Sequence, residues 1–173
     1  NAGEASISGL ELELMALLTE GLTLSASYGY LDGDYKEYLV LNPATGRPVD
    51  VKDERESPLL AQNRGNVVLS YARPLGGLGD FGMCLSWSYI DDMAGYAENS
   101  ASTFLDAYSL VAGRIAISNI SFDASGMLEV ALWGKNLTDE EYYNSGIDFG
   151  AFGFAGNQFG DPRTYGIEVS YEF

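Results

Sequence analysis

The sequence ends in Tyr165-Gly-Ile167-Glu-Val169-Ser-Tyr171-Glu-Phe173, with an aromatic or aliphatic side chain at every second position. Successive side chains of a β-strand point to opposite faces, so this pattern predicts a strand with one entirely apolar face. A soluble sheet would bury such a face under a second layer. Aromatic residues at both tips instead suit a strand that faces lipid in a transmembrane barrel.

The composition excludes several classes of function. The net charge of −16, with only nine Lys and Arg residues, disfavours nucleic acid as a partner. The absence of His removes a Ser-His triad, a His acid or base and a His metal ligand. Cys84 is the only cysteine, so neither an internal disulfide nor a thiolate metal cluster can form. The composition therefore excludes His-based catalysis and a metal site built from His or Cys ligands.

Alternation with a period of two predicts seven strands. They lie at about Ile7–Leu18, Leu22–Tyr30, Asn66–Arg73, Phe81–Tyr89, Val111–Ile117, Leu128–Lys135 and Tyr165–Phe173. A helix competes in the first stretch alone, where the leucines also fit a 3.6-residue period, and the neighbouring strands favour strand there. No apolar run is long enough for a transmembrane helix, so a membrane crossing would have to use strands.

The connections between the predicted strands alternate strictly in length. The short ones are residues 19–21, 74–80 and 119–126, and the long, irregular ones are residues 32–62, 91–106 and 138–162. Up-and-down outer-membrane barrels have short periplasmic turns and long extracellular loops, whereas a Greek-key sandwich has no reason to keep this order. Aromatic residues at both ends of the strands predict two girdles: Tyr28, Tyr30, Trp87, Tyr89, Tyr108 and Tyr165 outside, and Tyr71, Phe81, Tyr171 and Phe173 on the periplasmic side.

Seven antiparallel strands leave the first and the last strand parallel, so they cannot close a barrel alone. We predict an all-β fold in which residues 1–173 are the C-terminal segment of a larger, antiparallel up-and-down transmembrane β-barrel. Inward-facing Glu11, Glu13, Arg114 and Lys135 are then expected to hydrogen-bond neighbouring strands or material inside the barrel, rather than to form a glycosidase acid–base pair.

A second motif runs from Trp133 to Tyr143 as WGKNLTDEEYY. Thr138 and Glu141 have the spacing of a capping box, which predicts a short helical turn where the sixth strand ends. Such a cap and a ligand-binding role are equally compatible with the motif. Its residues are Lys135, Asn136, Leu137, Thr138, Asp139, Glu140, Glu141 and Tyr142.

The last long loop is the best candidate for ligand binding. It carries Phe149, Phe152, Phe154 and Phe159, separated by glycines. Exposed aromatic side chains are costly unless they meet a ligand, another loop or lipid, so ligand contact and packing against sister loops are both expected roles. The acidic residues of this loop match no calcium-binding pattern and are interpreted as a solvated surface.

The sequence resembles the C-terminus of TonB-dependent outer-membrane receptors. The resemblance lies in GKNLTDEEYY (134–143), in GDPRTYGIEVSYEF (160–173) with its terminal assembly signal at Tyr165, Ile167, Val169, Tyr171 and Phe173, and in LELELMALLTEGLTLSASYGYLDGDY (10–35). It implies a barrel of about 22 strands whose lumen is closed by an N-terminal plug. Neither the plug nor the segment that engages the energising partner is recognised here, so this chain is not expected to transport alone.

The resemblance also implies a function and a location. Such receptors are expected to import a scarce, bulky ligand, namely a ferric siderophore, haem, cobalamin or an oligosaccharide, across the bacterial outer membrane. The implied partners are the rest of the barrel and its plug, the inner-membrane energising complex, the barrel-assembly machinery and outer-membrane lipid. The resemblance thus implies a transporter component and not an enzyme, with no cofactor and no metal. A small complete barrel or adhesin, a soluble carbohydrate-binding β-sandwich and an outer-membrane enzyme remain as alternatives.

Overall fold

The computed structural model describes residues 3–98, 100–121 and 126–173. The strands are β1 (Gly3–Thr19), β2 (Leu22–Leu41), β3 (Pro48–Asp50), β4 (Asn63–Pro74), β5 (Asp80–Ile90), β6 (Tyr108–Ser121), β7 (Met127–Lys135), β8 (Tyr143–Phe149), β9 (Phe154–Phe159) and β10 (Thr164–Glu172). Short 3-10 helices are η1 (Lys52–Glu54), η2 (Gly76–Leu78) and η3 (Gly150–Phe152). No helix in the described residues is long and apolar enough to cross a membrane.

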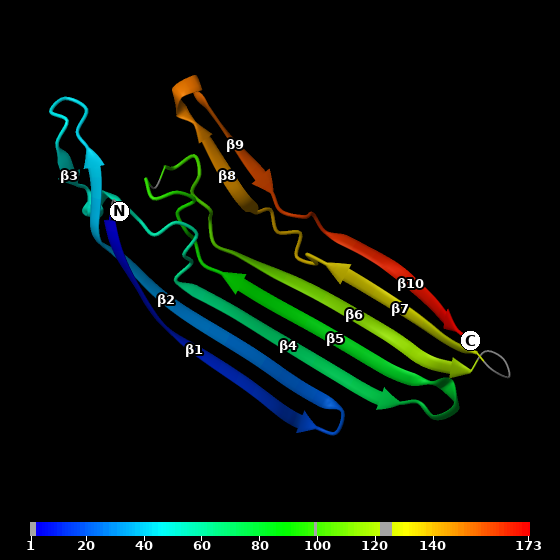
Figure 1. The fold of residues 1–173 in the computed structure, drawn as a ribbon. Helices are drawn as coiled ribbons and strands as arrows, with labels where there is room; N and C mark the ends of the chain where they lie inside the picture. The colour runs from blue at the N-terminus through cyan, green and yellow to red at the C-terminus, as the bar shows by residue number, and fades with distance from the viewer. Residues whose placement is uncertain (1–2, 99, 122–125) are drawn as a thin grey trace.

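The seven predicted strands form one curved antiparallel sheet in the order β1-β2-β4-β5-β6-β7-β10 (Figure 1). Every neighbouring pair is antiparallel, and β1 and β10 are the two edges of the sheet within the described residues. The first stretch is therefore a strand and not the alternative helix. The sheet is part of a barrel wall rather than a closed barrel, as the strand count predicts.

The register joins the alternating side chains into continuous rows. Leu24, Leu69 and Leu85 are opposite one another across β2, β4 and β5, and Ile115, Leu132 and Ile167 are opposite one another across β6, β7 and β10. The other face carries rows such as Ser70, Cys84, Arg114, Trp133 and Gly166. One face is thus apolar along the whole sheet, and we call it the lipid face; the opposite face is the inner face.

No second layer covers the lipid face in the described part of the chain. Leu14, Leu85, Ile167 and Val169 expose 55%, 44%, 71% and 64% of their surface. A soluble sandwich would bury these side chains at a gain of about 25 cal/mol per Å². Their exposure on one continuous face contradicts the sandwich alternative.

The short connections all lie at one end of the sheet and the long ones at the other (Figure 1). The turn between β1 and β2 needs glycine, because Gly21 has a φ of 76° and a Cβ there would lie 2.1 Å from the carbonyl oxygen of Ala72. Residues 122–125 of the third short turn lie outside the described residues. The predicted asymmetry of the two ends is confirmed.

Two of the three long loops are more regular than predicted. β2 continues to Leu41 and pairs with both β1 and the short β3, so much of the stretch from residue 32 to 62 is strand. Residues 143–159 form a separate β8–β9 hairpin. Strand was missed here because neither face of an extramembrane ribbon meets hydrocarbon, so its residues need not alternate between apolar and polar.

These segments together form an outer loop layer, defined as the described residues of 31–62, 91–107 and 136–163. Ala61, Ala94, Thr103 and Leu105, which lie in this layer, are almost fully buried. The layer is joined by backbone hydrogen bonds from Leu59 to Ala94 (2.8 Å) and by a reciprocal pair between Met93 and Leu105 (3.0 Å each). Much of the tightly packed core therefore lies outside the seven-stranded sheet.

Candidate functional site

The β8–β9 hairpin carries the four phenylalanines beyond the end of the sheet (Figure 1). Phe149 and Phe154 are register partners at the tip, and their rings stack with centroids 4.9 Å apart. Phe152, in η3, lies 6.5 Å from Phe154 by ring centroid. These three residues form what we call the phenylalanine tip.

Phe159 is not part of this tip. It pairs with Tyr143 at the opposite end of the hairpin, with ring centroids 4.8 Å apart. The hairpin spans about 17 Å between these two aromatic pairs, measured along β9 at about 3.3 Å per residue. The structure therefore brings three of the four predicted residues together and places the fourth at the base of the hairpin. Phe152 exposes 79% of its surface and Phe154 58%, so the tip is open to the exterior.

Ser100 and Ser102 of the neighbouring loop are hydrogen-bonded to Asp148 of the hairpin, and we call this contact the latch. The hydroxyls of Ser100 and Ser102 donate to Oδ2 of Asp148 at 2.9 and 3.0 Å. Gly146 lies against Thr103, where a Cβ would come within 3.0 Å of the Thr103 Cα. The Ser100 bond first, and then the Ser102 bond, lower the pKa of Asp148 because they stabilise its charged form. The latch holds the tip through a charged acceptor at neutral pH.

Asn136 lies at the base of the hairpin, and we call this residue and its contacts the joint. These contacts show that the predicted helix cap at Thr138 is wrong. Its Oδ1 accepts from the backbone N–H of Glu140 (2.8 Å), and its Nδ2 donates to the carbonyls of Glu140 (2.8 Å) and Asp161 (3.1 Å). Leu137 and Thr138 form a turn and not the predicted helix. Asn136 has a φ of 48°, which asparagine tolerates better than most residues, so the chain bends before Thr138 can start a helix.

The rest of the motif packs around this joint. The Tyr142 ring stacks on Tyr108 with centroids 4.3 Å apart, and glycine at position 160 leaves room for it, because a Cβ there would lie 2.0 Å from the Tyr142 ring. Arg163 forms an ion pair with Asp139 at 3.0 Å. Both the leaving and the returning chain are thereby fixed, so the motif positions the hairpin.

The predicted outer girdle is wrong at Tyr108. It is the register partner of Ile90, whereas Tyr89 pairs with Ser109, so Tyr108 lies on the inner face and not on the lipid face. The girdle prediction rested on the position of Tyr108 near the outer end of the strand, whereas the predicted alternation of Val111 and Gly113 already places Tyr108 on the inner face. Tyr28, Tyr30, Trp87, Tyr89 and Tyr165 keep the predicted parity.

A hollow of about 360 Å³ lies between the first two long loops. Its lining is polar and includes Asp32, Asp34, Glu56 and Asp92, with Arg55 as a basic residue. Among the described residues, no group of three or more Asp, Glu, Cys or His side chains is arranged to hold a metal ion. The hollow therefore adds negative potential to the outer loop layer without forming a metal centre.

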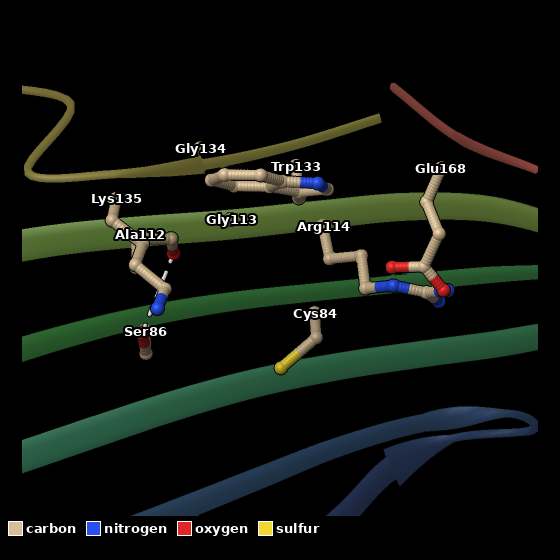
Figure 2. Close-up of a pocket in the computed structure, with 9 residues that line it drawn as sticks. All are labelled: Cys84, Ser86, Ala112, Gly113, Arg114, Trp133, Gly134, Lys135 and Glu168. Carbon is tan, nitrogen blue, oxygen red and sulfur yellow. Dashed lines mark hydrogen bonds and ion pairs between the residues drawn. The ribbon is translucent and has the colours of Figure 1, made fainter. Parts of the chain in front are cut away.

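The inner face carries an ion cluster over three strands. Arg114 of β6 pairs with Glu129 of β7, and its Nη2 lies 3.6 Å from Oε1 of Glu168 of β10. Figure 2 shows this side chain reaching toward Glu168 in a hollow of about 470 Å³ that Trp133 and Cys84 also line. Arg114 is thus bonded to neighbouring strands, one of its two expected roles. Glu11 and Glu13 are both exposed on β1, and Lys135 lines the same hollow as Arg114.

Several functional contacts were missed by sequence reasoning. The latch joins residues 46 and 48 positions apart, and no local pattern connects them. The role of Asn136 had a weak signal, since an asparagine directly after a strand commonly adopts a left-handed conformation. The terminal residues Tyr165, Ile167, Val169 and Tyr171 lie where predicted, on the lipid face of β10.

Comparisons with known proteins agree with this architecture. The chain is similar to the ferric yersiniabactin uptake receptor FyuA from Yersinia pestis, with a TM-score of 0.76 at 17% identity over 100% of this chain and 24% of that one. It is also similar to the siderophore receptor PiuA from Acinetobacter baumannii, with a TM-score of 0.68 at 16% identity over 98% of this chain and 22% of that one. The chain thus spans about a quarter of the length of these receptors, and the likeness establishes its fold.

A family model described as "TonB dependent receptor-like, beta-barrel" matches residues 1–137, which is most of the chain. The matched part includes β1 to β7, whose register joins the lipid-face rows. The sequence resemblance is therefore confirmed, and the chain belongs to the family of TonB-dependent receptor β-barrels.

Proposed function

We propose that the chain forms part of an outer-membrane active transporter that binds a scarce, bulky ligand outside the cell and imports it. Barrels of this family lie in the outer membrane and belong to transporters rather than enzymes. The observation that carries the proposal is the single-layered sheet with one continuous apolar face and an ordered loop layer at one end. The ligand class is a ferric siderophore, haem, cobalamin or an oligosaccharide.

The phenylalanine tip is the proposed ligand contact in this chain. Phe149, Phe152 and Phe154 are exposed on a hairpin that the latch and Asn136 hold in place, so a ligand would not have to order it. Their rings favour a ligand with a flat apolar or aromatic part. Phe159 is proposed to support the hairpin, because its ring packs on Tyr143.

The ligand proposal is tested with the full-length receptor. Cells that depend on it are grown with siderophores, haem, cobalamin or oligosaccharides as the sole source of the limiting nutrient, and binding of the active compound is then measured. Phe152→Ala should weaken binding about tenfold, since truncating a central aromatic contact costs more than about 1 kcal/mol. Leu41→Ala, which removes an exposed apolar side chain of β2 outside the hairpin, is the control and should bind nearly normally. Equal binding by both variants would exclude the tip as the contact.

Import is proposed to need two parts that the resemblance implies: a plug inside the barrel and an inner-membrane energising complex. Removing the energising protein should abolish uptake and leave surface binding intact. Loss of binding together with uptake, at unchanged receptor levels, would argue against an energised import step.

The terminal strand is proposed to direct insertion by the barrel-assembly machinery. Its apolar row ends with Tyr171 and Phe173, whose rings stack at 6.1 Å. Deleting Phe173, or replacing Tyr171 and Phe173 by Asp, should block membrane insertion, measured as surface-exposed receptor. Glu172→Gln, between them on the other face, is the control. Normal surface levels of the Asp variant would refute the assembly role.

A further inference from the structure

A hollow of about 540 Å³ lies on the lipid face over β4. Its floor is Gly65, which the register places between Tyr28 of β2 and Tyr89 of β5. A Cβ at Gly65 would have the Trp87 ring as its nearest neighbour, at 3.6 Å, which is ordinary contact. The local fold therefore does not require glycine here. Because Gly65 has no side chain, it leaves a gap in a row of tyrosines.

The gap continues as a groove toward the middle of the sheet. Trp87 and Tyr89 form one wall, with nearly parallel rings 6.2 Å apart, and Tyr28 forms the other. Ala26 and Val67 extend the floor. From Asn63 to Val67 the groove follows β4 for about 13 Å, at about 3.3 Å per residue. Its length and apolar lining suit a hydrocarbon chain.

A polar arch closes the outer end of the groove. The Tyr28 hydroxyl donates to Oδ1 of Asn63 (2.6 Å), Nδ2 of Asn63 donates to Oδ2 of Asp91 (2.6 Å), and the Tyr89 hydroxyl donates to Oδ1 of Asp91 (2.9 Å). The Asn63 bond first, and then the Tyr89 bond, lower the pKa of Asp91, so its carboxylate is charged at neutral pH.

The arch presents a carboxylate and few donors. Both phenol protons and one Asn63 amide proton are used inside it, and the Asp91 carboxylate, which also accepts a bond from the backbone N–H of Asp92, has about four acceptor positions. The residues that line the groove, all within the described part of the chain, include neither Lys nor Arg. An anionic headgroup would face an unopposed carboxylate, whereas an ammonium group would gain a charge-assisted hydrogen bond.

We propose that this groove binds one membrane lipid, with an acyl chain over Gly65 and a primary ammonium headgroup at Asp91. The proposal rests on the proposed function only in requiring that the lipid face meets a bilayer. It adds a ligand site on the outside of the barrel wall, separate from the loops that would take the imported ligand.

Native mass spectrometry of the full-length receptor in detergent tests the proposal. The probes are phosphatidylethanolamine, phosphatidylcholine and phosphatidylglycerol with identical acyl chains. Phosphatidylethanolamine should be retained about tenfold more than the other two, equivalent to about 1.4 kcal/mol, because it alone brings ammonium N–H donors. Asp91→Asn should remove this preference, and Gly65→Leu should abolish retention of all three lipids.

Two controls carry similar changes outside the groove. Ala16→Leu adds similar bulk on the lipid face of β1, and Asp53→Asn neutralises an exposed acid. Both should behave as wild type. Equal retention of the three lipids by wild type, or normal retention by Gly65→Leu, would overturn the proposed lipid site. Neither result would contradict the proposed transport function. A receptor that stays in solution without detergent would overturn the transport proposal as well.

Discussion

The membrane-spanning sheet and the outer loop layer are stabilised in different ways. The sheet presents Leu85, Ile167 and Val169 on an exposed apolar face, and its strands are held together by backbone hydrogen bonds between neighbours. The loop layer buries small side chains such as Ala61 and Ala94 and depends on single polar contacts by Asn136 and Asp148. The sheet is thus specified by the alternation of apolar and polar residues, which matches the different surroundings of its two faces. The loops are specified by individual contacts between residues that are distant in the sequence.

Charging the lipid face tests this difference most strongly. Leu85 lies in the middle of β5, so Leu85→Lys should destabilise the receptor by about 2–4 kcal/mol, the cost of a lysine near the bilayer midplane. The measurement is the free energy of unfolding in lipid vesicles. Ser86→Lys, one residue on and facing inward, should cost clearly less. Equal costs would mean that the two faces of the sheet do not meet different environments.

Removing the Asn136 side chain should have the next largest effect. Asn136→Gly keeps the left-handed backbone but loses three hydrogen bonds in a buried position, which costs about 1–3 kcal/mol. Hydrogen exchange should quicken in β8 and β9 and stay unchanged in β4 and β5. Thr138→Ala, at the residue expected from sequence to cap a helix, should change little. A larger effect of Thr138→Ala would restore the capping box.

The smallest expected effect is a pH dependence of the latch. Ser100 and Ser102 lower the pKa of Asp148 below its ordinary value of 3.8. A lowered pKa in the folded state means that the carboxylate stabilises the hairpin fully above pH 3.8 and that this stabilisation is lost as the pH falls through the lowered value. The protection of the β8 and β9 amides from hydrogen exchange, after correction for the pH dependence of the intrinsic exchange rate, should therefore fall below pH 3.8 in wild type. Asp148→Asn should reduce that change, and an unchanged pH profile would exclude the latch.

The sequence predicted most of the sheet because its physical cause is local. A strand in the wall of a barrel meets hydrocarbon on one side, so every second residue is constrained, and a short run such as Phe81–Tyr89 is enough to show it. The rows at Leu85 and Ile167 confirm the parity. Tyr108 was placed on the wrong face because it was assigned to the girdle from its position near the strand end and not from the alternation of the strand, which continues to it.

The candidate site was predicted in part. The phenylalanines were recognised as exposed loop aromatics, but sequence spacing could not separate Phe159 from the tip, because the hairpin register decides which rings meet. The WGKNLTDEEYY motif was predicted to be a strand exit with a helix cap at Thr138, whereas the structure has a turn there that the side chain of Asn136 stabilises. A capping box is a local pattern, whereas the Asn136 bond to Asp161 joins residues 25 positions apart.

The sequence by itself determined the strands, their inner and lipid faces, the asymmetry of the connections and the open strand count. The tertiary structure alone decided the latch between Ser100, Ser102 and Asp148, the joint at Asn136 and the groove beside Gly65. The physical reason is that the contrast between hydrocarbon and water acts on each residue separately and leaves a period of two. Hydrogen bonds and gaps depend instead on which distant residues the register brings together.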